Sequence, residues 1–584
     1  MTQENSSSSC SSSSSVVEQN RVLSALLSLH PSASSKPGSS SSAVDVAVQV
    51  SDRVPAGRGL VFTHDIKPGQ QVLSLPSDAL INVKSYKSFF HPDTLPIAVG
   101  IAGSSKKGER KLSSSQLLSL LIARAKMESE LRRGQDEERE AESKKHETLR
   151  LFVRTLPKRF ESAPLSWSLL AHSIDKDSKQ GDEETDWKRR FFQTLLLAFP
   201  SHSRELSNKV RRRFEQDWLS INSMRANHPD LLAEPSLLAI NPDLARRIIR
   251  SIDLNTYLWA WLCVNSRCVF LPLSLADHSD NFTLAPMLDM ANHTPDPALE
   301  CKVRYASDGG LELCGPISDV SPSGLKGGDE CFITYGPHSN QSLLCEYGFV
   351  LPPQLEFAAE GDDGGNGARW KGSRYVDVLM DQEIETMLKA QGKGGEAKIE
   401  LLQNRGYWGE FTIHPYPEPA HPSHRLIPAL RLAALDLHAP APAATSKVAK
   451  THHQPGVKAG KKAFPVHQSN FAAQGSASDL DKWEETLTGY RDIVSEENER
   501  HAHLILVDLC ESKRKDTEQA RIHLVGAEKI LQAHGDDGDE ADANGLEPGR
   551  EGCRLSLSFV KQLLDEEDAV LRLVGQAARD QVEW

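Results

Sequence analysis

The spacing of apolar and polar positions changes several times along the chain. From residue 46 the segments VAVQV, GLVFTHDI and QQVLSLP are short, β-branched or alternating, and separated by glycine and proline. This pattern is typical of small twisted strands. Apolar residues then recur at helical spacing, as in QLLSLLIARAK (116–126) and in WAWLCV (259–264). Strand patterns return between residues 270 and 350, so we expect a β unit that a helical insert, about residues 104–255, interrupts.

The last part of the chain has a mainly helical pattern. After LPP (351–353), the segments LDKWEETLTGYRDIV (480–494) and LSLSFVKQLLDEEDAVLRLV (555–574) carry apolar residues at helical spacing. An Ala-, Pro- and Lys-rich stretch, about residues 439–475, interrupts this pattern and predicts a disordered loop. Residues 351–584 are therefore expected to form a separate, mainly helical domain.

Two further stretches carry too few apolar residues to build a core. Residues 1–44 are Ser-rich in two blocks, and residues 127–147 are almost entirely charged or polar. Segments of this composition bury too little apolar surface to offset the entropy lost on ordering. We therefore expect a disordered tail over residues 1–44 and a solvated extension of the insert over residues 127–147. The total of 584 residues, 39% of them hydrophobic, leaves room for two or three units with real cores.

Charge and cysteine content narrow the classes of protein that fit. The net charge of -13 argues against direct nucleic-acid binding by the whole surface. Nine cysteines occur without a CxxC pair, so neither a zinc knuckle nor a disulfide framework is supported, and no metal site is predicted. No apolar run of eighteen residues or more and no signal-peptide pattern is present, so no membrane contact is expected. We expect an intracellular protein, in the cytoplasm, the nucleus or both.

Candidate chemistry lies in three separated segments. They are GRGL (57–60), MLDMANHT (287–294) and GGDECFITYGPHSNQSLLCEYGFV (327–350). Taken alone, each has an ordinary structural explanation. The two glycines fit a tight turn, the histidine fits a satisfied structural residue, and the tyrosines fit core aromatics whose hydroxyls have found partners. The order of the three segments along one chain is what favours a functional site.

This order resembles that of the SET-domain protein methyltransferases, in particular the class typified by the Rubisco large-subunit methyltransferase. The matching residues are Gly57-Arg58-Gly59-Leu60, Ser266-Arg267, Asp289-Met290-Ala291-Asn292-His293, Gly328-Asp329-Glu330, Tyr335-Gly336 and Tyr347-Gly348-Phe349. The resemblance implies an α+β fold, namely a SET-domain β fold with a pseudoknot and a helical insert over residues 45–350. It further implies that the helical domain 351–584 binds the protein substrate.

The resemblance also implies a cofactor and roles for individual residues. The cofactor is S-adenosyl-L-methionine, which Gly57, Arg58, Gly59, Asn292, His293 and Tyr335 are expected to bind. The Asn292 amide, with a donor and an acceptor, suits a zwitterionic ligand. Tyr335 and Tyr347 are the expected catalytic residues, Arg267, Tyr347 and Phe349 are expected to contact the substrate, and Asp289 is expected to support the loop. Tyr305 is a further candidate, for a tyrosine that some members carry beyond the Asn-His motif.

A lysine side chain must be unprotonated to accept a methyl group, so the site must favour the neutral amine. With a reference pKa of about 10.4, only about one lysine in a few thousand is unprotonated at neutral pH. A channel that excludes water beside a sulfonium cation lowers that pKa, and aromatic walls tolerate a cation or a methylated amine. Tyr335 and Tyr347 fit this requirement by their residue type.

Three functions are compatible with these residues. We favour a protein-lysine N-methyltransferase that acts on a non-histone protein, is a monomer, and docks its substrate on the helical domain. The second is methylation of a histidine side chain by the same class of enzyme. The third is a scaffold or binding protein that keeps the SET fold without turnover.

Overall fold

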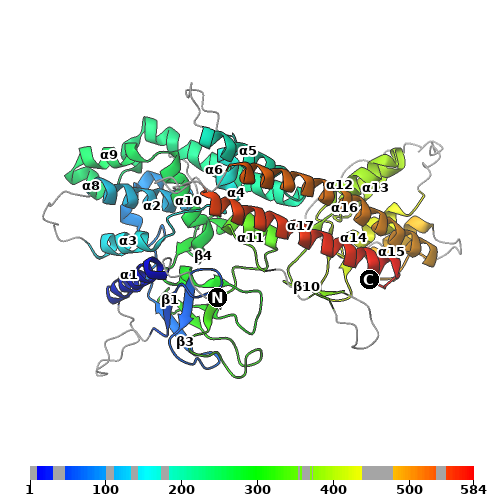
Figure 1. The fold of residues 1–584 in the computed structure, drawn as a ribbon, viewed down its shortest axis with the longest axis horizontal. Coiled ribbons are helices and arrows are strands. Elements are labelled where there is room, and N and C mark those ends of the chain that lie inside the picture. Colours follow the sequence, from blue (N-terminus) through cyan, green and yellow to red (C-terminus); the bar gives the residue numbers. More distant parts are fainter. Residues whose placement is uncertain are drawn as a thin grey trace, which may run out of the picture. The chain divides into compact units, whose positions relative to one another are not determined.

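The computed structural model describes most of the chain and divides it into two compact units (Figure 1). The described residues are 9–30, 46–99, 111–132, 143–172, 183–352, 355–357, 368–370, 372–436, 478–534 and 548–584. The first unit comprises Met1–Gln354, Gly372–Tyr375 and Gln519–Asp565, and the second comprises Leu355–Lys371, Val376–Glu518 and Glu566–Trp584. The sequence predicted a division near residue 350, whereas residues 519–565 are grouped with the first unit.

Small sheets of the first unit bring distant segments together. One sheet has the order β1-β2-β9-β6, a second the order β3-β8-β7, and a third pairs β4 with β5. The strands are β1 (Val48–Ser51), β2 (Gly59–Phe62), β3 (Gln71–Leu75), β4 (Cys268–Phe270), β5 (Phe282–Leu284), β6 (Asn292–His293), β7 (Lys302–Tyr305), β8 (Leu311–Cys314) and β9 (Glu330–Ile333). In Figure 1 the blue strands β1 and β3 lie beside green segments from much later in the chain. All three motif segments thus meet in one sheet.

Strand β9 lies between β2 and β6 and brings the three motif segments together. It pairs antiparallel with β2 and parallel with β6, so that the GRGL, Asn-His and GDE segments are neighbours. Together with the helices, these sheets confirm the predicted α+β class. The pseudoknot stays a prediction, because strand pairing alone does not define how one segment threads another.

Helices between the two groups of strands form the predicted insert. They are α2 (Ser114–Leu131), α3 (Lys144–Thr155), α4 (Pro164–His172), α5 (Glu183–Leu197), α6 (Ser201–Asn227), α7 (Pro229–Leu232), α8 (Pro235–Ile240), α9 (Pro242–Ser251) and α10 (Leu254–Arg267). A capping box of Ser113 and Gln116 starts α2, and the Asp253 carboxylate caps α10. The helical region extends to Arg267 rather than ending near residue 255. The two ends of the charged stretch 127–147 belong to α2 and α3, and its middle, residues 133–142, lies outside the described residues.

The predicted disordered tail is wrong over part of its length. Residues Ser9–Ser28 form helix α1, which packs against α3 and β1. Val22, Leu23, Leu26 and Leu27 are buried, because they recur at helical spacing on one face. The Asn20 amide also bonds to both the backbone N–H and the carbonyl of Val50, at 2.9 and 3.0 Å. A short apolar stripe is therefore enough to order a helix whose overall composition is polar.

The second unit has its own hydrophobic core and small strands. Its elements are β10 (Leu355–Phe357), β11 (Ala368–Trp370), β12 (Val378–Leu379), α12 (Asp381–Ala390), α13 (Lys393–Asn404), β13 (Thr412–His414), β14 (His421–Pro422), α14 (Leu426–Ala433) and α15 (Asp479–Leu487). Helices α16 (Glu496–Ala533) and α17 (Arg550–Arg579) contribute residues to both units. Buried Trp483 and Phe411 belong to the core of the second unit. The predicted loop 439–475 lies outside the described residues.

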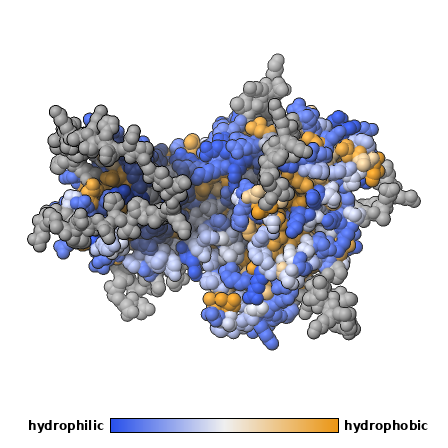
Figure 2. All heavy atoms as spheres, turned by 180° about the vertical axis from the view of Figure 1, so that it is seen from behind, coloured by the Kyte–Doolittle hydropathy of each residue, from blue (hydrophilic) through white to orange (hydrophobic). Residues whose placement is uncertain are grey.

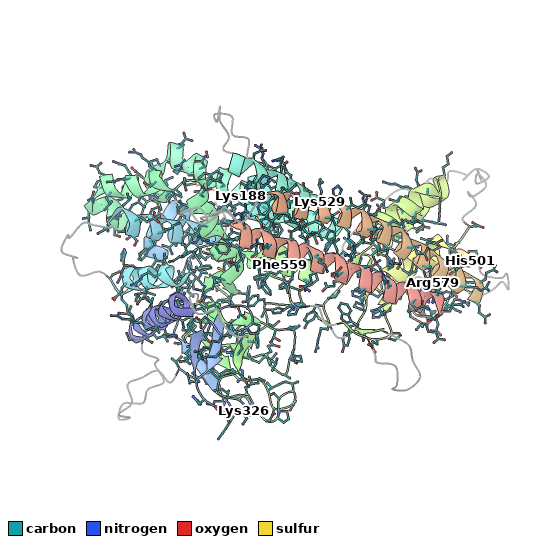
Figure 3. The ribbon with its side chains drawn as sticks, viewed as in Figure 1. Lys188, Lys326, His501, Lys529, Phe559 and Arg579 are labelled. Carbon is teal, nitrogen blue, oxygen red and sulfur yellow. The ribbon has the colours of Figure 1, made fainter. Side chains whose placement is uncertain are left out.

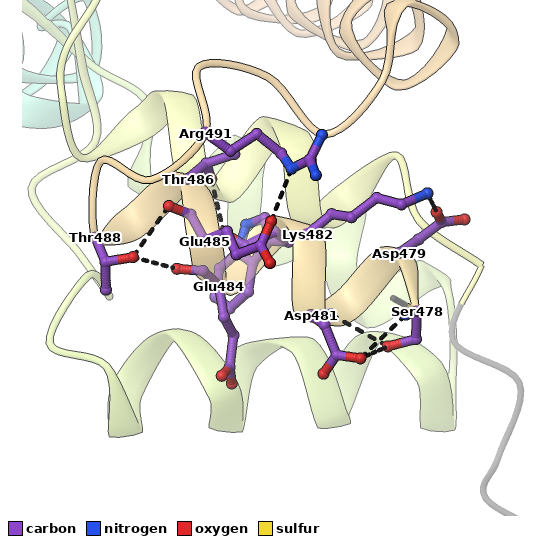
Figure 4. A network of polar contacts seen from close by, with 10 residues as sticks. Ser478, Asp479, Asp481, Lys482, Glu484, Glu485, Thr486, Thr488 and Arg491 are labelled. Carbon is purple, nitrogen blue, oxygen red and sulfur yellow. Dashed lines mark hydrogen bonds and ion pairs between the residues drawn. The ribbon is translucent and has the colours of Figure 1, made fainter. Parts of the chain in front are cut away.

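Helix α15 illustrates how local chemistry sets an element's bounds in the second unit (Figure 4). The Ser478 hydroxyl accepts a hydrogen bond from the Asp481 N–H at 3.2 Å, and the Asp481 carboxylate accepts one from the Ser478 N–H at 3.0 Å. This capping box satisfies N–H groups that the first turn leaves unpaired. Gly489, with φ of 74°, follows the helix end. The helix is therefore shorter than the predicted segment 480–494.

One face of the molecule is mostly polar (Figure 2). Figure 2 shows a largely hydrophilic face with separate apolar areas. Within the described ranges, no helix combines the length and the apolar character that crossing a membrane requires. The same ranges contain no group of three or more His, Cys, Asp or Glu side chains arranged to hold a metal ion.

Candidate active site

The glycines of the GRG segment serve two different purposes. Gly57 has a φ of 82°, a backbone conformation that favours glycine, and a Cβ there would meet nothing within 4 Å. Gly59 begins β2, and a Cβ on it would lie 2.6 Å from Asn292 Nδ2 and 2.7 Å from Glu330 Oε1. Gly57 thus permits the turn, whereas Gly59 leaves room for two side chains of the site.

The Asn292 amide connects all three motif segments. Its Nδ2 donates to the Arg58 carbonyl at 3.0 Å and to Glu330 Oε1 at 2.7 Å. An amide nitrogen has two hydrogens, so both are used, and Oδ1 accepts no hydrogen bond from a described residue. The sequence led us to expect a donor and an acceptor for the ligand. The geometry corrects this expectation, because only the acceptor is available.

Two arginines surround one buried carboxylate. Arg267, at the end of α10, donates through Nη1 to the Asp289 carbonyl at 2.8 Å and to its Oδ2 at 3.1 Å. Burial raises the pKa of Asp289, and the charges of Arg267 and Arg58 oppose that rise. Burial lowers the pKa of Arg58, and repulsion from Arg267 lowers it further. The cluster carries more positive than negative charge, so it suits an anionic group of a ligand.

Four aromatic rings gather beside this cluster. The Tyr335 ring lies 5.0 Å from that of Tyr347, 6.2 Å from that of Phe349 and 5.3 Å from that of His293, measured between ring centroids. The Tyr335 hydroxyl donates to the Ala291 carbonyl at 2.9 Å, and burial raises the pKa of this hydroxyl. We call these four residues the site aromatic cluster. The structure thus brings together three residues that the sequence proposed for catalysis or substrate contact.

His293 is held as a neutral imidazole. Its Nδ1 accepts a hydrogen bond from the Tyr335 N–H at 3.1 Å, which requires that Nδ1 carry no proton. Burial, helped by the nearby His338, lowers the pKa of His293 to about 4. The buried Nε2 of His293, like Nε of Arg267, has no hydrogen-bond partner in the described part of the chain. The site therefore keeps polar atoms whose hydrogen bonds are unmet.

Several residues that support the site were not identified from the sequence. Asn265 Nδ2 donates to the Glu346 carbonyl at 3.0 Å, at the end of helix α11 (Asn340–Tyr347), and Arg213 pairs with the Glu346 carboxylate at 2.6 Å. The His338 Nε2 donates to the Tyr335 carbonyl at 3.2 Å. These contacts fix the backbone before Tyr347 and after Tyr335. The position of Asn265, two residues before Arg267, is the signal that could have revealed its role.

The turn before β9 is attached to the segment that follows β2. The Asp65 carboxylate accepts from the Gly327 N–H at 3.0 Å and from Lys326 Nζ at 2.8 Å, and Figure 3 labels Lys326 in this turn. Lys326 and Asp65 are largely exposed, so their ion pair contributes little to stability. The backbone bond to Gly327 nevertheless helps to align β9 with β2.

Tyr305 does not join the site aromatic cluster. It lies on β7 and is 57% exposed, and among the described residues its hydroxyl donates only to the Phe270 carbonyl, at 3.4 Å. Tyr305 therefore has the surroundings of a surface tyrosine.

The class to which these residues point is the SET-domain protein methyltransferases, and similarity to curated proteins confirms the resemblance. No family model matches the chain. The ribosomal lysine N-methyltransferase set11 of Schizosaccharomyces pombe is 27% identical over 182 residues, which are 31% of this chain and 38% of that protein. SET domain-containing protein 4 of Homo sapiens is 30% identical over 236 residues, which are 40% of this chain and 46% of that protein. The matches thus span less than half of each relative.

Solved structures give a weaker likeness over more of the chain. The SET domain of LSMT bound to lysine and AdoHcy aligns with a TM-score of 0.43 and 16% identity, covering 92% of this chain and 89% of that one. Rubisco LSMT bound to AdoMet aligns with a TM-score of 0.42 and 15% identity, covering 97% and 93%.

Proposed function

We propose that the protein is an S-adenosylmethionine-dependent protein-lysine N-methyltransferase acting on a non-histone protein. One observation carries this proposal. Tyr335 contacts the Asn-His segment through its hydroxyl and N–H, and its ring contacts Tyr347 and Phe349. A single tyrosine thus connects the residues suited to a methyl donor with an aromatic wall suited to an amine. Methyl transfer needs such an arrangement, because donor and acceptor react only when held in line and close together.

The polar residues fit the amino-acid end of the cofactor. S-adenosylmethionine supplies an activated methyl group on a sulfonium and carries an α-ammonium and a carboxylate. Asn292 Oδ1, which accepts no hydrogen bond from any described residue, can accept one from an ammonium, and the surplus positive charge of Arg58 and Arg267 suits a carboxylate. The unpartnered Nε of Arg267 is a donor in the same place. Both charged ends of the ligand therefore have matching groups.

The aromatic residues fit an amine acceptor. Tyr335 and Tyr347 are partly buried, and their ring faces favour a cation or a methylated amine in surroundings where water is scarce. Burial disfavours the charged form of a lysine side chain, which promotes the neutral nucleophile. Similarity to two proteins named ribosomal lysine N-methyltransferases supports lysine over histidine as the acceptor.

We propose that the helical C-terminal domain docks the protein substrate, and that the enzyme is a monomer in the cytoplasm, the nucleus or both. The separate hydrophobic core of the second unit supports an independent docking domain. Eight cysteines of the described chain are free thiols, which supports a reducing compartment.

The proposal is tested by following a labelled methyl group. The full chain is incubated with methyl-labelled S-adenosylmethionine and a lysate of its source, and mass spectrometry locates the labelled residue. We expect label on lysine, and an excess of unlabelled cofactor should remove it. Label on histidine would favour the second function considered above. No label, together with no cofactor binding by calorimetry, would favour the non-catalytic scaffold.

A further inference from the structure

We propose that Glu330 is a positioning residue, which fixes the Asn292 amide so that the site selects a ligand carrying an α-ammonium group. This inference rests on the proposed function and adds a determinant of cofactor recognition. Glu330 begins β9, opposite Val61 of β2, and its side chain is half-buried. Glu330 would act on the ligand indirectly, by holding Asn292.

The orientation of the amide follows from the chemistry of its neighbours. The nitrogen and oxygen of an asparagine amide are distinguished by their hydrogen-bond partners. One neighbour of the Asn292 amide is the Arg58 carbonyl and the other is the Glu330 carboxylate, and both only accept. The atom facing them must therefore be Nδ2. Oδ1 is then left to accept from the ligand, and an ammonium is the donor that an isolated acceptor binds most strongly.

Glu330 makes the stronger of the two bonds that hold this orientation. Its distance to Nδ2 is 2.7 Å, against 3.0 Å for the Arg58 carbonyl, and a carboxylate acceptor strengthens the bond through its charge. Without Glu330, the Arg58 carbonyl alone would hold the Asn292 amide. Rotation of this amide about its Cβ–Cγ bond would then cost less free energy. The amide could then turn its N–H groups toward the ligand, where they would repel an ammonium.

Gly59 shows that the chain makes room for this contact. A Cβ at position 59 would lie 2.6 Å from Asn292 Nδ2 and 2.7 Å from Glu330 Oε1, so any other residue would push the pair apart. Burial raises the pKa of Glu330, and the hydrogen bond from Asn292 opposes that rise. The bond therefore favours the charged carboxylate, which is the form that holds the amide most firmly.

The test compares two ligands that differ by one group. Calorimetry on the full chain measures the dissociation constants of S-adenosylhomocysteine and of its analogue without the α-amino group. Wild type should prefer the amino compound, and Glu330→Ala should weaken its binding by about ten-fold or more while leaving the analogue unchanged. Glu330→Gln keeps an acceptor oxygen, so it should retain part of the preference. A merely structural role would weaken both ligands equally.

Controls separate this inference from the proposed function. Glu312→Gln, on β8 and also half-buried, removes a charge elsewhere in the same unit and should keep the wild-type preference. If Glu330→Ala does not fold, the ligand preference is measured in Glu330→Gln, where it should be lower than in wild type. An unchanged preference in a folded Glu330 variant would overturn the inference and leave the proposed function standing. If wild type bound neither ligand, the proposed function itself would fail.

Discussion

The first unit contains two aromatic clusters that resemble each other in geometry and differ in their surroundings. One, which we call the insert aromatic cluster, comprises Trp167, Phe191, Phe192 and Phe199 of the helical insert. Its ring centroids lie 4.8 to 5.8 Å apart. In the site aromatic cluster, Tyr335 lies 5.0 to 6.2 Å from its three neighbours. Ring spacing alone does not distinguish a core from a site.

Burial and polar contacts make the difference. The four rings of the insert aromatic cluster are at most 1% exposed, and its one polar ring atom, Trp167 Nε1, donates to the Glu161 carbonyl. In the site aromatic cluster only His293 is fully buried, and Tyr335 is held by hydrogen bonds at both its hydroxyl and its N–H. The insert aromatic cluster thus contributes stability, whereas the site aromatic cluster holds side chains in fixed positions at a partly open surface.

The largest expected effect is on stability, from truncating the insert aromatic cluster. Phe192→Ala removes a fully buried ring that stacks on Trp167 and contacts Phe191 edge-on. The free energy of unfolding should fall by about 3–5 kcal/mol, because a cavity remains in close-packed surroundings. Urea unfolding measures this change. Methyl transfer per folded molecule should stay near the wild-type rate, and a selective loss of transfer would contradict the distinction between the clusters.

The same kind of truncation in the site aromatic cluster should affect transfer instead. Tyr347→Ala removes a half-buried ring beside Tyr335. We expect kcat/KM for the protein substrate to fall by about 10–100-fold, because the acceptor amine loses a positioning wall. Calorimetry should show cofactor affinity close to that of wild type. If cofactor binding weakened and the KM for the acceptor stayed unchanged, Tyr347 would contact the cofactor rather than the acceptor amine.

A pH effect should follow from the neutral state of His293. Its pKa is lowered from 6.5 to about 4 by burial, so between these values an unfolded chain takes up a proton that the folded chain does not. Stability should therefore fall as the pH drops from about 6.5 to about 4, and His293 contributes no further loss below that window. The slope should be up to about 1 kcal/mol per pH unit, allowing for partial solvent screening.

The His293 contribution is isolated by a neutral replacement. Urea midpoints are measured at several pH values for wild type and His293→Gln, and the variant should lose less stability across the window. Parallel pH curves for the two proteins would show that His293 takes up its proton equally in both states.

The smallest effect is expected at Tyr305, an aromatic residue outside both clusters. Tyr305→Phe removes the hydroxyl of an exposed residue, which in the described part of the chain makes one long hydrogen bond, to the Phe270 carbonyl. Stability should change by less than about 0.5 kcal/mol, as at most surface positions. Transfer rates should match wild type, and a clear loss would mean that Tyr305 reaches the substrate.

The resemblance, and the residues that meet at the candidate site, could be predicted from the sequence because each motif is local, whereas the roles of those residues stay predictions. Gly57, Asn292 and Tyr335 lie in short segments whose order alone indicated the resemblance. The hydrogen-bond partners of the site residues were harder to predict, because they depend on packing between distant segments. Asn292 bonds to a carbonyl 234 positions earlier in the chain, and Asn265 to one 81 positions later. Only the folded sheet shows that both amide hydrogens of Asn292 are used.

Average composition is a poor guide to the structure of the N-terminal segment for a related reason. Helix α1 contains many serines, and an average over residues 1–44 conceals the four buried apolar residues on one of its faces. Helix α1 is stabilised by the packing of these residues on α3 and β1 rather than by its helix propensity. The position of a few apolar residues therefore decided the structure of this segment more than the mean composition did.

The role of Tyr335 is tested most directly by measuring methyl transfer by wild type and Tyr335→Phe at saturating S-adenosylmethionine. The substitution removes one hydroxyl, which bonds to the Ala291 carbonyl, and keeps the ring and the N–H bond to His293. We expect a fall of about 100-fold or more in the rate of lysine methylation. Cofactor affinity should stay near that of wild type, and the free energy of unfolding should fall by only about 1 kcal/mol. Full activity in Tyr335→Phe would contradict the central role given to this tyrosine.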